Sequence, residues 1–149
     1  MLTDPSPARL TGDRGSSQIL MPVGVLVVLL LGAIAFDLSW VYEAQRELTD
    51  AAASAANDAV TFGLSPSSLR DGSGGRLDAR RVVDAVDRSL AVHHLSGLDP
   101  NGTAITFDGP DEVRVTLVRH VDYVFAKSIP GANRGRDVTA NVAATVIRR

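Results

Sequence analysis

The sequence predicts an α+β fold in which an N-terminal membrane-spanning helix continues into the folded domain. Three observations support this prediction. Residues 19–36 carry no charged or strongly polar side chain. Apolar residues then recur at three- and four-residue steps as far as residue 62, which is the spacing of one helix face. After residue 97 the apolar period becomes two, which is typical of strands that bury one face.

The apolar run is long enough to cross a bilayer. Residues 19–36 would form a helix of about 27 Å at ~1.5 Å per residue, against a hydrocarbon core of ~30 Å. Trp40 and Tyr42 stand where aromatic side chains mark a membrane–water boundary, so we place the span at residues 19–41. Asp37 would be costly at the centre of a bilayer, but near one end of the span it can reach the headgroups.

The sequence leaves two alternatives to a membrane span. The run could be the buried core helix of a soluble domain, although the remaining segments are too few to cover it on every side. It could also be a cleaved secretory signal, because Ala33, Ile34 and Ala35 resemble a cleavage site. The run is longer than a usual signal core and the helical pattern continues past that point, which favours the span.

The charges that flank the span predict its orientation. Residues 1–18 form the predicted cytoplasmic tail, which we expect to be disordered because it is rich in Pro, Ser, Gly and Asp. Arg9 and Arg14 precede the span, and Arg46 is the only basic residue shortly after it. The positive-inside rule therefore places the N-terminus in the cytoplasm. Residues 42–149 would then form an extracytoplasmic α+β domain.

The helix is expected to continue through residues 42–62. No Gly or Pro interrupts this segment, and its Ala, Leu, Glu, Gln and Arg residues favour helices. Gly63 fits a helix end, and Pro66 prevents continuation. The apolar face of the segment consists mainly of alanine and includes Ala51, Ala55 and Ala59. Such a face permits close approach, either by the protein's own domain or by another subunit.

Two further segments precede the strands. Residues 65–76 are rich in Ser and Gly and predict a flexible surface loop. Residues 78–95 predict an amphipathic helix that stops before Gly97. The predicted buried face of this helix comprises Val82, Val83, Val86 and Leu90, with Ala79 and His94 at its ends.

Three antiparallel strands are predicted, with one exposed face and one face packed on helices. The first, residues 103–107, follows a turn at Asn101-Gly102 and directs Ile105 and Phe107 inward. The second covers residues 113–125. A loop at residues 128–136 leads to the third, whose inward series is Val138, Ala140, Val142, Ala144 and Val146.

The second strand has one irregularity. Its predicted inward residues are Val113, Val115, Leu117, Val121, Tyr123 and Phe125. Arg119 interrupts this apolar series, which suggests a bulge or an edge position.

The residues do not form a pattern that predicts catalysis or binding of a metal or cofactor. His93, His94 and His120 have no carboxylate at a ligand spacing, and no G-x-S-x-G motif surrounds a serine. Residues 72–75 lack the lysine and hydroxyl of a phosphate loop. The chain has no cysteine, and its 15 basic and 17 acidic residues include no basic block. Nucleic acid is therefore not an expected partner, and no small-molecule substrate is expected.

Three segments resemble the TadE/TadG-like family of the tight-adherence (Flp) pilus assembly machinery, which is pilin-like in outline. DRGSSQILMP, residues 13–22, resembles the Arg-Gly that opens the family's hydrophobic segment. FDLSWVYEAQRELTDAAASAANDAV, residues 36–60, resembles its Asp at the end of the span, followed by an aromatic turn and an alanine-rich helix. VRVTLVRHVDYVFAKSIPG and RDVTANVAATV, residues 113–131 and 136–146, resemble its paired strands.

This resemblance implies a pseudopilin-like fold and a function. The implied protein is a non-enzymatic, single-pass membrane subunit of a Tad/Flp-type pilus assembly or related secretion apparatus. Its partners would be the lipid bilayer and other membrane or pilus-assembly subunits. The alternative is a membrane-tethered extracytoplasmic binding or sensor module. The soluble part offers few aromatic residues to line a ligand pocket, namely Phe62, Phe107, Tyr123 and Phe125.

The resemblance also implies candidate processing and packing residues. Pilin-like precursors are cut after a glycine, usually with a glutamate at the fifth residue beyond it. Cleavage after Gly15 would make Ser16 the N-terminus, but Leu20 occupies the glutamate position, so the sequence does not decide whether the tail is removed. Gly24 and Gly32 lie roughly on one face of the span, where small residues let a second helix approach. The candidate helix-packing residues are Gly24, Gly32, Asp37, Ala51, Ala55 and Ala59.

Overall fold

A computed structural model of the chain describes residues 14–72 and 75–147, except for the side chains of residues 14–19 and 69. Its elements, in chain order, are α1 (Arg14–Phe62), α2 (Pro66–Arg70), α3 (Ala79–His93), β1 (Ala104–Phe107), β2 (Glu112–Asp122), the 3-10 helix η1 (Ala126–Ser128) and β3 (Gly135–Thr145). Of the predicted tail, residues 1–13 lie outside the described residues. Residues 14–18 belong to α1, so the helix begins earlier than the sequence suggested.

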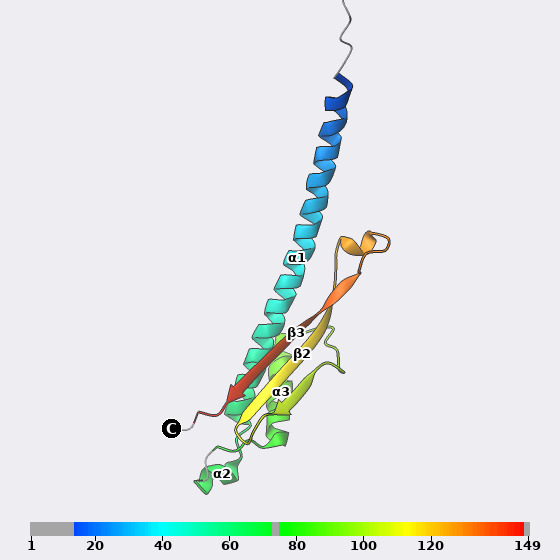
Figure 1. Cartoon of the computed structure of the whole chain (residues 1–149). Helices are drawn as coiled ribbons and strands as arrows, with labels where there is room; N and C mark the ends of the chain where they lie inside the picture. The colour runs from blue at the N-terminus through cyan, green and yellow to red at the C-terminus, as the bar shows by residue number, and fades with distance from the viewer. Residues whose placement is uncertain (1–13, 73–74, 148–149) are drawn as a thin grey trace, which may run out of the picture.

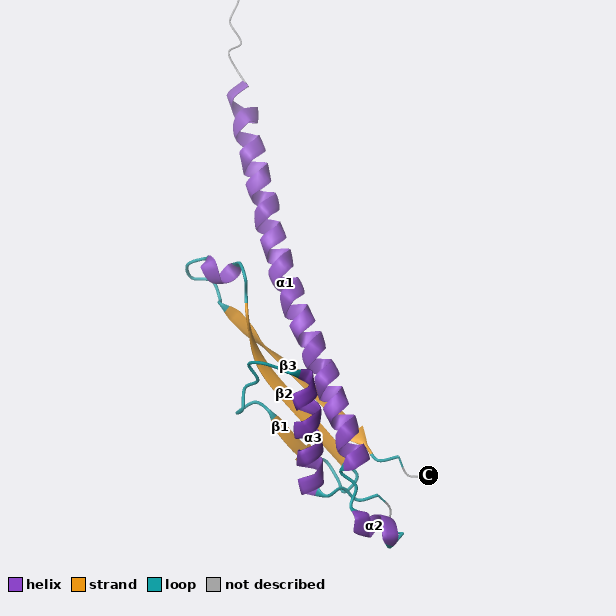
Figure 2. Cartoon of the chain, turned by 180° about the vertical axis from the view of Figure 1, so that it is seen from behind, coloured by secondary structure: helices purple, strands orange, loops and turns teal. Residues whose placement is uncertain are grey.

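One long helix organises the molecule. α1 runs for 49 residues without interruption. Its N-terminal half projects beyond the other elements, and its C-terminal half lies with α3 on one face of a three-stranded sheet (Figures 1 and 2). This arrangement confirms the predicted α+β class, with a long apolar N-terminal helix, a short helix and an antiparallel sheet.

The core forms on the alanine-rich face of α1. Ala51, Ala55 and Ala59 are each 0% exposed, together with Leu48, Ala52 and Ala56. They belong to one buried cluster with residues of α3, β2 and β3, among them Val82, Val86, Val115, Leu117 and Ala140. Because alanine side chains are small, the backbone of α1 lies close to both the sheet and α3. The protein's own domain therefore covers this face.

The three strands are antiparallel and stand in the order β1-β2-β3. In β3 the predicted inward series is confirmed, since Val138 and Ala140 are buried and Val142 and Ala144 are half-buried. In β1 the prediction is only partly right. Ile105 is half-buried, but Phe107 is 43% exposed, and it is the last residue of β1, which is one of the two edge strands.

Arg119 is neither at a bulge nor at an edge. β2 pairs with β3 without a break from Glu112↔Thr145 to Asp122↔Gly135, and β2 is the central strand. The inward side chain of Arg119 instead contacts α1. Its Nη2 donates to Glu47 Oε2 at 2.9 Å and to the Ala44 carbonyl oxygen at 3.3 Å. A charge on the inner face is therefore accommodated by a partner on the helix.

α3 is shorter than predicted, and its buried face is centred differently. The Asp78 side chain caps it by accepting from the backbone N–H groups of Arg80 and Arg81. It ends at His93, because His94 adopts a left-handed conformation with φ of 49°. Val82 and Val86 are buried as predicted, with Leu90 half-buried. Ala85 and Ser89 complete the buried face, whereas the predicted Val83, Ala79 and His94 are exposed.

The predicted loop at residues 65–76 contains the short helix α2, so it is more ordered than its composition suggested. Both ends of the segment are held together. Leu64 and Leu77 form an antiparallel bridge, and the Ser65 N–H donates to the Arg76 carbonyl at 2.8 Å. Residues 73–74, at the tip of the segment, lie outside the described residues.

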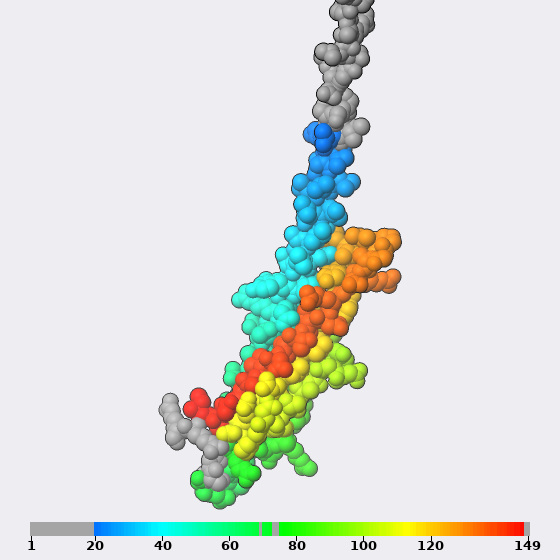
Figure 3. Space-filling model, viewed as in Figure 1, coloured from blue at the N-terminus to red at the C-terminus, as the bar shows by residue number. Residues whose placement is uncertain are grey.

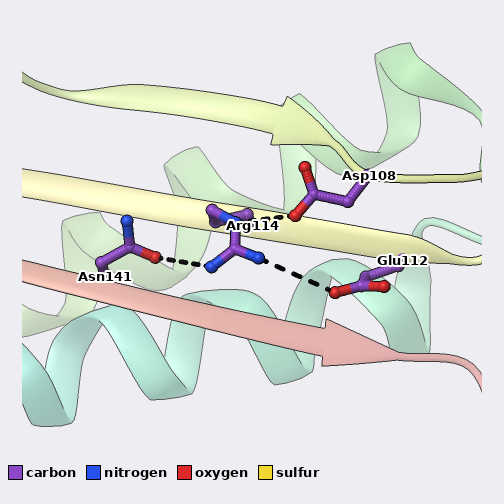
Figure 4. Close-up of polar contacts among 4 residues, drawn as sticks. All are labelled: Asp108, Glu112, Arg114 and Asn141. Carbon is purple, nitrogen blue, oxygen red and sulfur yellow. Dashed lines mark hydrogen bonds and ion pairs between the residues drawn. The ribbon is translucent and has the colours of Figure 1, made fainter.

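The outer face of the sheet carries a polar network centred on Arg114 (Figure 4). Its guanidinium donates to Asp108 Oδ2 at 2.7 Å and to Asn141 Oδ1 at 3.0 Å, and it lies 4.0 Å from Glu112 Oε1. These contacts join the end of β1, β2 and β3. Each contact is solvent-exposed, so each contributes little to stability on its own. Together they favour the observed register of β2 with its neighbouring strands.

The packing of the alanine face predicts a specific sensitivity to added volume. Ala55→Leu should lower the free energy of unfolding by about 1–3 kcal/mol, because a packed core has no space for the extra methylene groups. Asn57→Leu is the control, since Asn57 is exposed on the same helix and surface changes usually fall within about ±0.5 kcal/mol. Chemical unfolding of the full-length protein in detergent measures both. Equal stability of the two variants would contradict this packing.

Candidate functional site

The N-terminal half of α1 presents a bare apolar surface. Large apolar side chains from Leu20 to Phe36 are exposed, from 46% at Val27 to 76% at Met21. Within the described residues, α1 is the one helix that is long and apolar enough to cross a membrane, and only 6% of its most apolar window is buried. This low burial rules out the alternative of a buried core helix. Leaving such a surface in water would cost about 25 cal/mol per Å².

A buried carboxylate marks the end of this bare surface. Asp37 is 5% exposed, although it lies on a helix whose neighbouring residues are exposed. Its carboxylate accepts hydrogen bonds from the backbone N–H groups of Val124 at 2.7 Å, Phe125 at 3.0 Å and Ala126 at 2.8 Å. Beside it, the rings of Phe36 and Phe125 meet edge to face at 5.4 Å between centroids. We call this set of contacts the Asp37 clasp.

The clasp shows which groups surround the aspartate that the sequence places near one end of the span. The carboxylate is enclosed by the segment that leaves β2 and forms η1. Hydrogen bonds to a charged group are stronger than those between neutral groups. Three of them therefore fix the position of the η1 segment, 87 to 89 residues further along the chain, on α1. The sequence showed the unusual aspartate but not its partners, because backbone donors leave no signal in a sequence.

An open groove lies beyond the clasp, between α1, the residues after α3 and the end of β2. It has a volume of about 590 Å³. Its polar lining residues are Glu43, Glu47, His94, Ser96, Arg119, His120 and Asp122, and Trp40 forms part of its wall. Carboxylates and basic groups alternate in this lining, and some are paired with one another, as in Arg119–Glu47. The groove was not predicted, since its residues come from three separate segments.

His120 lies at the rim of the groove, between two carboxylates. Its Nδ1 is 2.6 Å from Asp137 Oδ1, and its Nε2 is 3.5 Å from Asp122 Oδ1. The hydrogen bond to Asp137 raises the pKa of His120 above its usual value. Desolvation opposes this shift, and the negative charges of Asp137 and Asp122 reinforce it. Asp122 is two residues from His120 on the same strand, whereas Asp137 is brought beside it by the register of β2 and β3.

The remaining predicted positions lie on the N-terminal half of α1. Gly15 and Ser16 fall within the first turns of the helix, where side chains are not described. A side chain added at Gly24 or Gly32 would meet nothing within 4 Å. Gly24 lines a shallow apolar hollow of about 390 Å³ together with Val28 and four neighbours. Within the described ranges, no three His, Asp or Glu side chains are arranged to hold a metal ion.

These features define a class of protein, namely a small α+β domain carried on one exposed apolar N-terminal helix. Residues 15–61 match the model of a family described as Putative Flp pilus-assembly TadE/G-like. The match covers α1 almost from end to end and supports the resemblance of the two sequence segments that lie largely on this helix. The strand segments that also resemble the family, residues 113–131 and 136–146, lie outside the match. The comparisons found no matching curated protein and no matching solved structure.

The Asp37 clasp predicts which segment loosens when the carboxylate is removed. In Asp37→Ala the three N–H groups lose their acceptor, at a cost on the order of 1–3 kcal/mol for each donor left buried. Amide hydrogen exchange at residues 124–126 should therefore accelerate strongly, while exchange in the middle of β2 changes little. In Asp37→Asn, which keeps one acceptor oxygen, the exchange rate at residues 124–126 should lie between those of the wild type and Asp37→Ala. Asp50→Ala, an exposed aspartate of the same helix, is the control, and identical exchange in all variants would rule the clasp out.

The pair His120–Asp137 predicts a pH dependence. Because folding raises the pKa of His120 above ~6.5, the protonated form stabilises the fold. This contribution is complete below pH ~6.5 and is lost as the pH rises through the folded-state pKa. An NMR titration of the ring should give a midpoint above that of free histidine, and Asp137→Asn should lower it. His93 in the same sample is an internal comparison. A midpoint unaffected by Asp137→Asn would contradict the pairing.

Proposed function

We propose that this protein is a non-enzymatic, single-pass membrane subunit of a Tad/Flp-type pilus assembly or related secretion apparatus. One observation carries the proposal. The segment that matches the pilus-assembly family, residues 15–61, is the same helix whose N-terminal half presents a bare apolar surface. The family supplies the system in which the protein acts, and the exposed surface supplies the reason for placing that helix in a membrane.

The proposed arrangement follows the elements. Residues 19–41 span the cell membrane, residues 1–18 form the cytoplasmic end, and residues 42–149 form the extracytoplasmic domain. The flanking arginines support this orientation through the positive-inside rule. The helix enters the domain without a hinge, so the membrane anchor and the domain core are parts of one rigid element.

The surfaces offered to other subunits are those that the protein's own domain leaves open. Ala51, Ala55 and Ala59 are occupied by the sheet and α3, so we assign them to the core of this chain. The hollow at Gly24, with Gly32 two turns further on, supports helix packing inside the membrane. The polar groove beside Trp40 supports contacts outside it. In this proposal the protein acts by packing, without cofactor or small-molecule substrate.

Deletion of the protein in its host tests the proposal. Cells without it should lose Flp-type pili, counted by electron microscopy, and the wild-type protein should restore them. Gly24→Leu should restore them poorly, since it fills the hollow at the helix surface, while Val27→Leu is the matched control. Normal piliation in the deletion strain would contradict the assembly function and favour the tethered binding module.

Location and processing are measured in the same cells. Single cysteines at Ser6 and Asp71 should react differently with an impermeant thiol reagent, with labelling at residue 71 only. Labelling at residue 6 alone would reverse the orientation. The intact mass of the membrane-bound protein distinguishes the full chain from cleavage after Gly15, and a mature protein that begins after Ala35 would indicate a removed secretory signal.

A further inference from the structure

The segment between β2 and β3 extends along α1 toward the bare end of the helix. We call residues 124–134 the η1 loop, since it contains the 3-10 helix Ala126–Ser128. Figures 1 and 2 show it projecting from the end of the sheet beside α1, and Figure 3 shows it lying against the helix where the bare surface begins. It is the part of the described domain that comes nearest to the membrane-spanning half of α1.

The Asp37 clasp fixes the depth of this loop. Three backbone N–H groups of residues 124–126 bind the Asp37 carboxylate, and Phe125 contacts Phe36. The uncharged run of α1 ends at Phe36, and the proposed span ends at residue 41, about 7 Å further along the axis. The headgroup layer of a bilayer is of comparable thickness, ~5–8 Å on each side of the hydrocarbon core. A loop held at residues 36 and 37 must therefore lie at that layer.

The composition of the loop matches this depth. Phe125 and Ile129 are 48% and 49% exposed, and Val124 is 38% exposed, although Phe36 and Asp37 of α1 hold one side of the segment. Lys127 and Arg134 are exposed in the same segment, and residues 124–134 contain no acidic residue. Apolar side chains next to basic groups are the combination that stabilises a segment at an anionic membrane surface.

We infer that the η1 loop is a second membrane contact that inserts into the headgroup layer beside α1. Val124, Phe125 and Ile129 face the boundary of the acyl chains, and Lys127 and Arg134 face lipid phosphates. The inference rests on the proposed function, because it requires α1 to span the bilayer. It commits to lipid rather than to a protein partner, because the loop is continuous with the apolar surface of the span and is held at its end. With two contacts, the tilt of α1 and its domain relative to the membrane is restricted.

Depth measurements on the full-length protein test the inference. The chain has no native cysteine, so a nitroxide can be attached singly at Ile129→Cys, Leu29→Cys or Asp71→Cys. The labelled proteins are reconstituted into vesicles of phosphatidylcholine and phosphatidylglycerol. Collisions with oxygen, which concentrates in the bilayer, are compared with collisions with a water-soluble nickel chelate. The label at residue 129 should collide with nickel several-fold less than the label at residue 71, and with oxygen more.

The possible outcomes distinguish membrane insertion of the η1 loop from membrane insertion of α1. Protection from nickel at residue 29 together with full nickel access at residue 129 would overturn the loop insertion and leave the span intact. Nickel access at residue 29 would overturn the proposed function itself. Shielding of residue 129 from both reagents would indicate a protein contact, such as a second copy, and would also overturn the inference. In the double variant that combines Lys127→Glu with the labelled Ile129→Cys, nickel access to residue 129 should rise. The matched control combines Asp71→Glu with the same labelled cysteine.

Discussion

The close approach of α1 to the rest of the domain is the constraint on which this structure depends. The sheet alone has three strands, and α3 has only fifteen residues, so neither could bury enough apolar surface without a third surface to pack on. The alanine face of α1 supplies that surface, with Ala51, Ala55 and Ala59 fully buried. The bare apolar half of α1 and the domain core are therefore not separate modules. Under the proposed function, membrane insertion and domain folding involve the same helix.

Polar contacts then determine the position of the sheet along α1. Where the bare apolar half of α1 ends, Asp37 binds the η1 loop. In the middle, Arg119 reaches from β2 to Glu47 and the Ala44 carbonyl, and Gln45 Nε2 donates to the Thr139 carbonyl of β3 at 2.9 Å. An alanine surface is smooth and would allow the sheet to slide, whereas directional bonds to charged and amide groups specify one position.

The sequence predicted the parts of the fold that depend on periodicity. The apolar run, the alanine stripe and the alternation in β3 are local patterns, and each was recovered in the structure. The errors arose where a long-range contact decides the outcome. Arg119 was interpreted as a bulge or an edge position because its partner Glu47 lies 72 residues away. Phe107 was predicted to be buried because the sequence does not show that its strand lies at an edge of the sheet. The clasp and the groove were likewise invisible, since backbone N–H groups and distant segments build them.

The packing of β3 against α1 has a mechanical consequence. β3 crosses the C-terminal half of α1 obliquely (Figure 1), and under the proposed function an assembling apparatus would pull on the N-terminal half of α1. A force along the axis of α1 would load the alanine contacts, Gln45, Arg119 and the Asp37 clasp simultaneously, in shear. Peeling the contacts apart one by one would require a force across the axis. The domain should thus resist a force along the axis of α1 more strongly than a force applied across it.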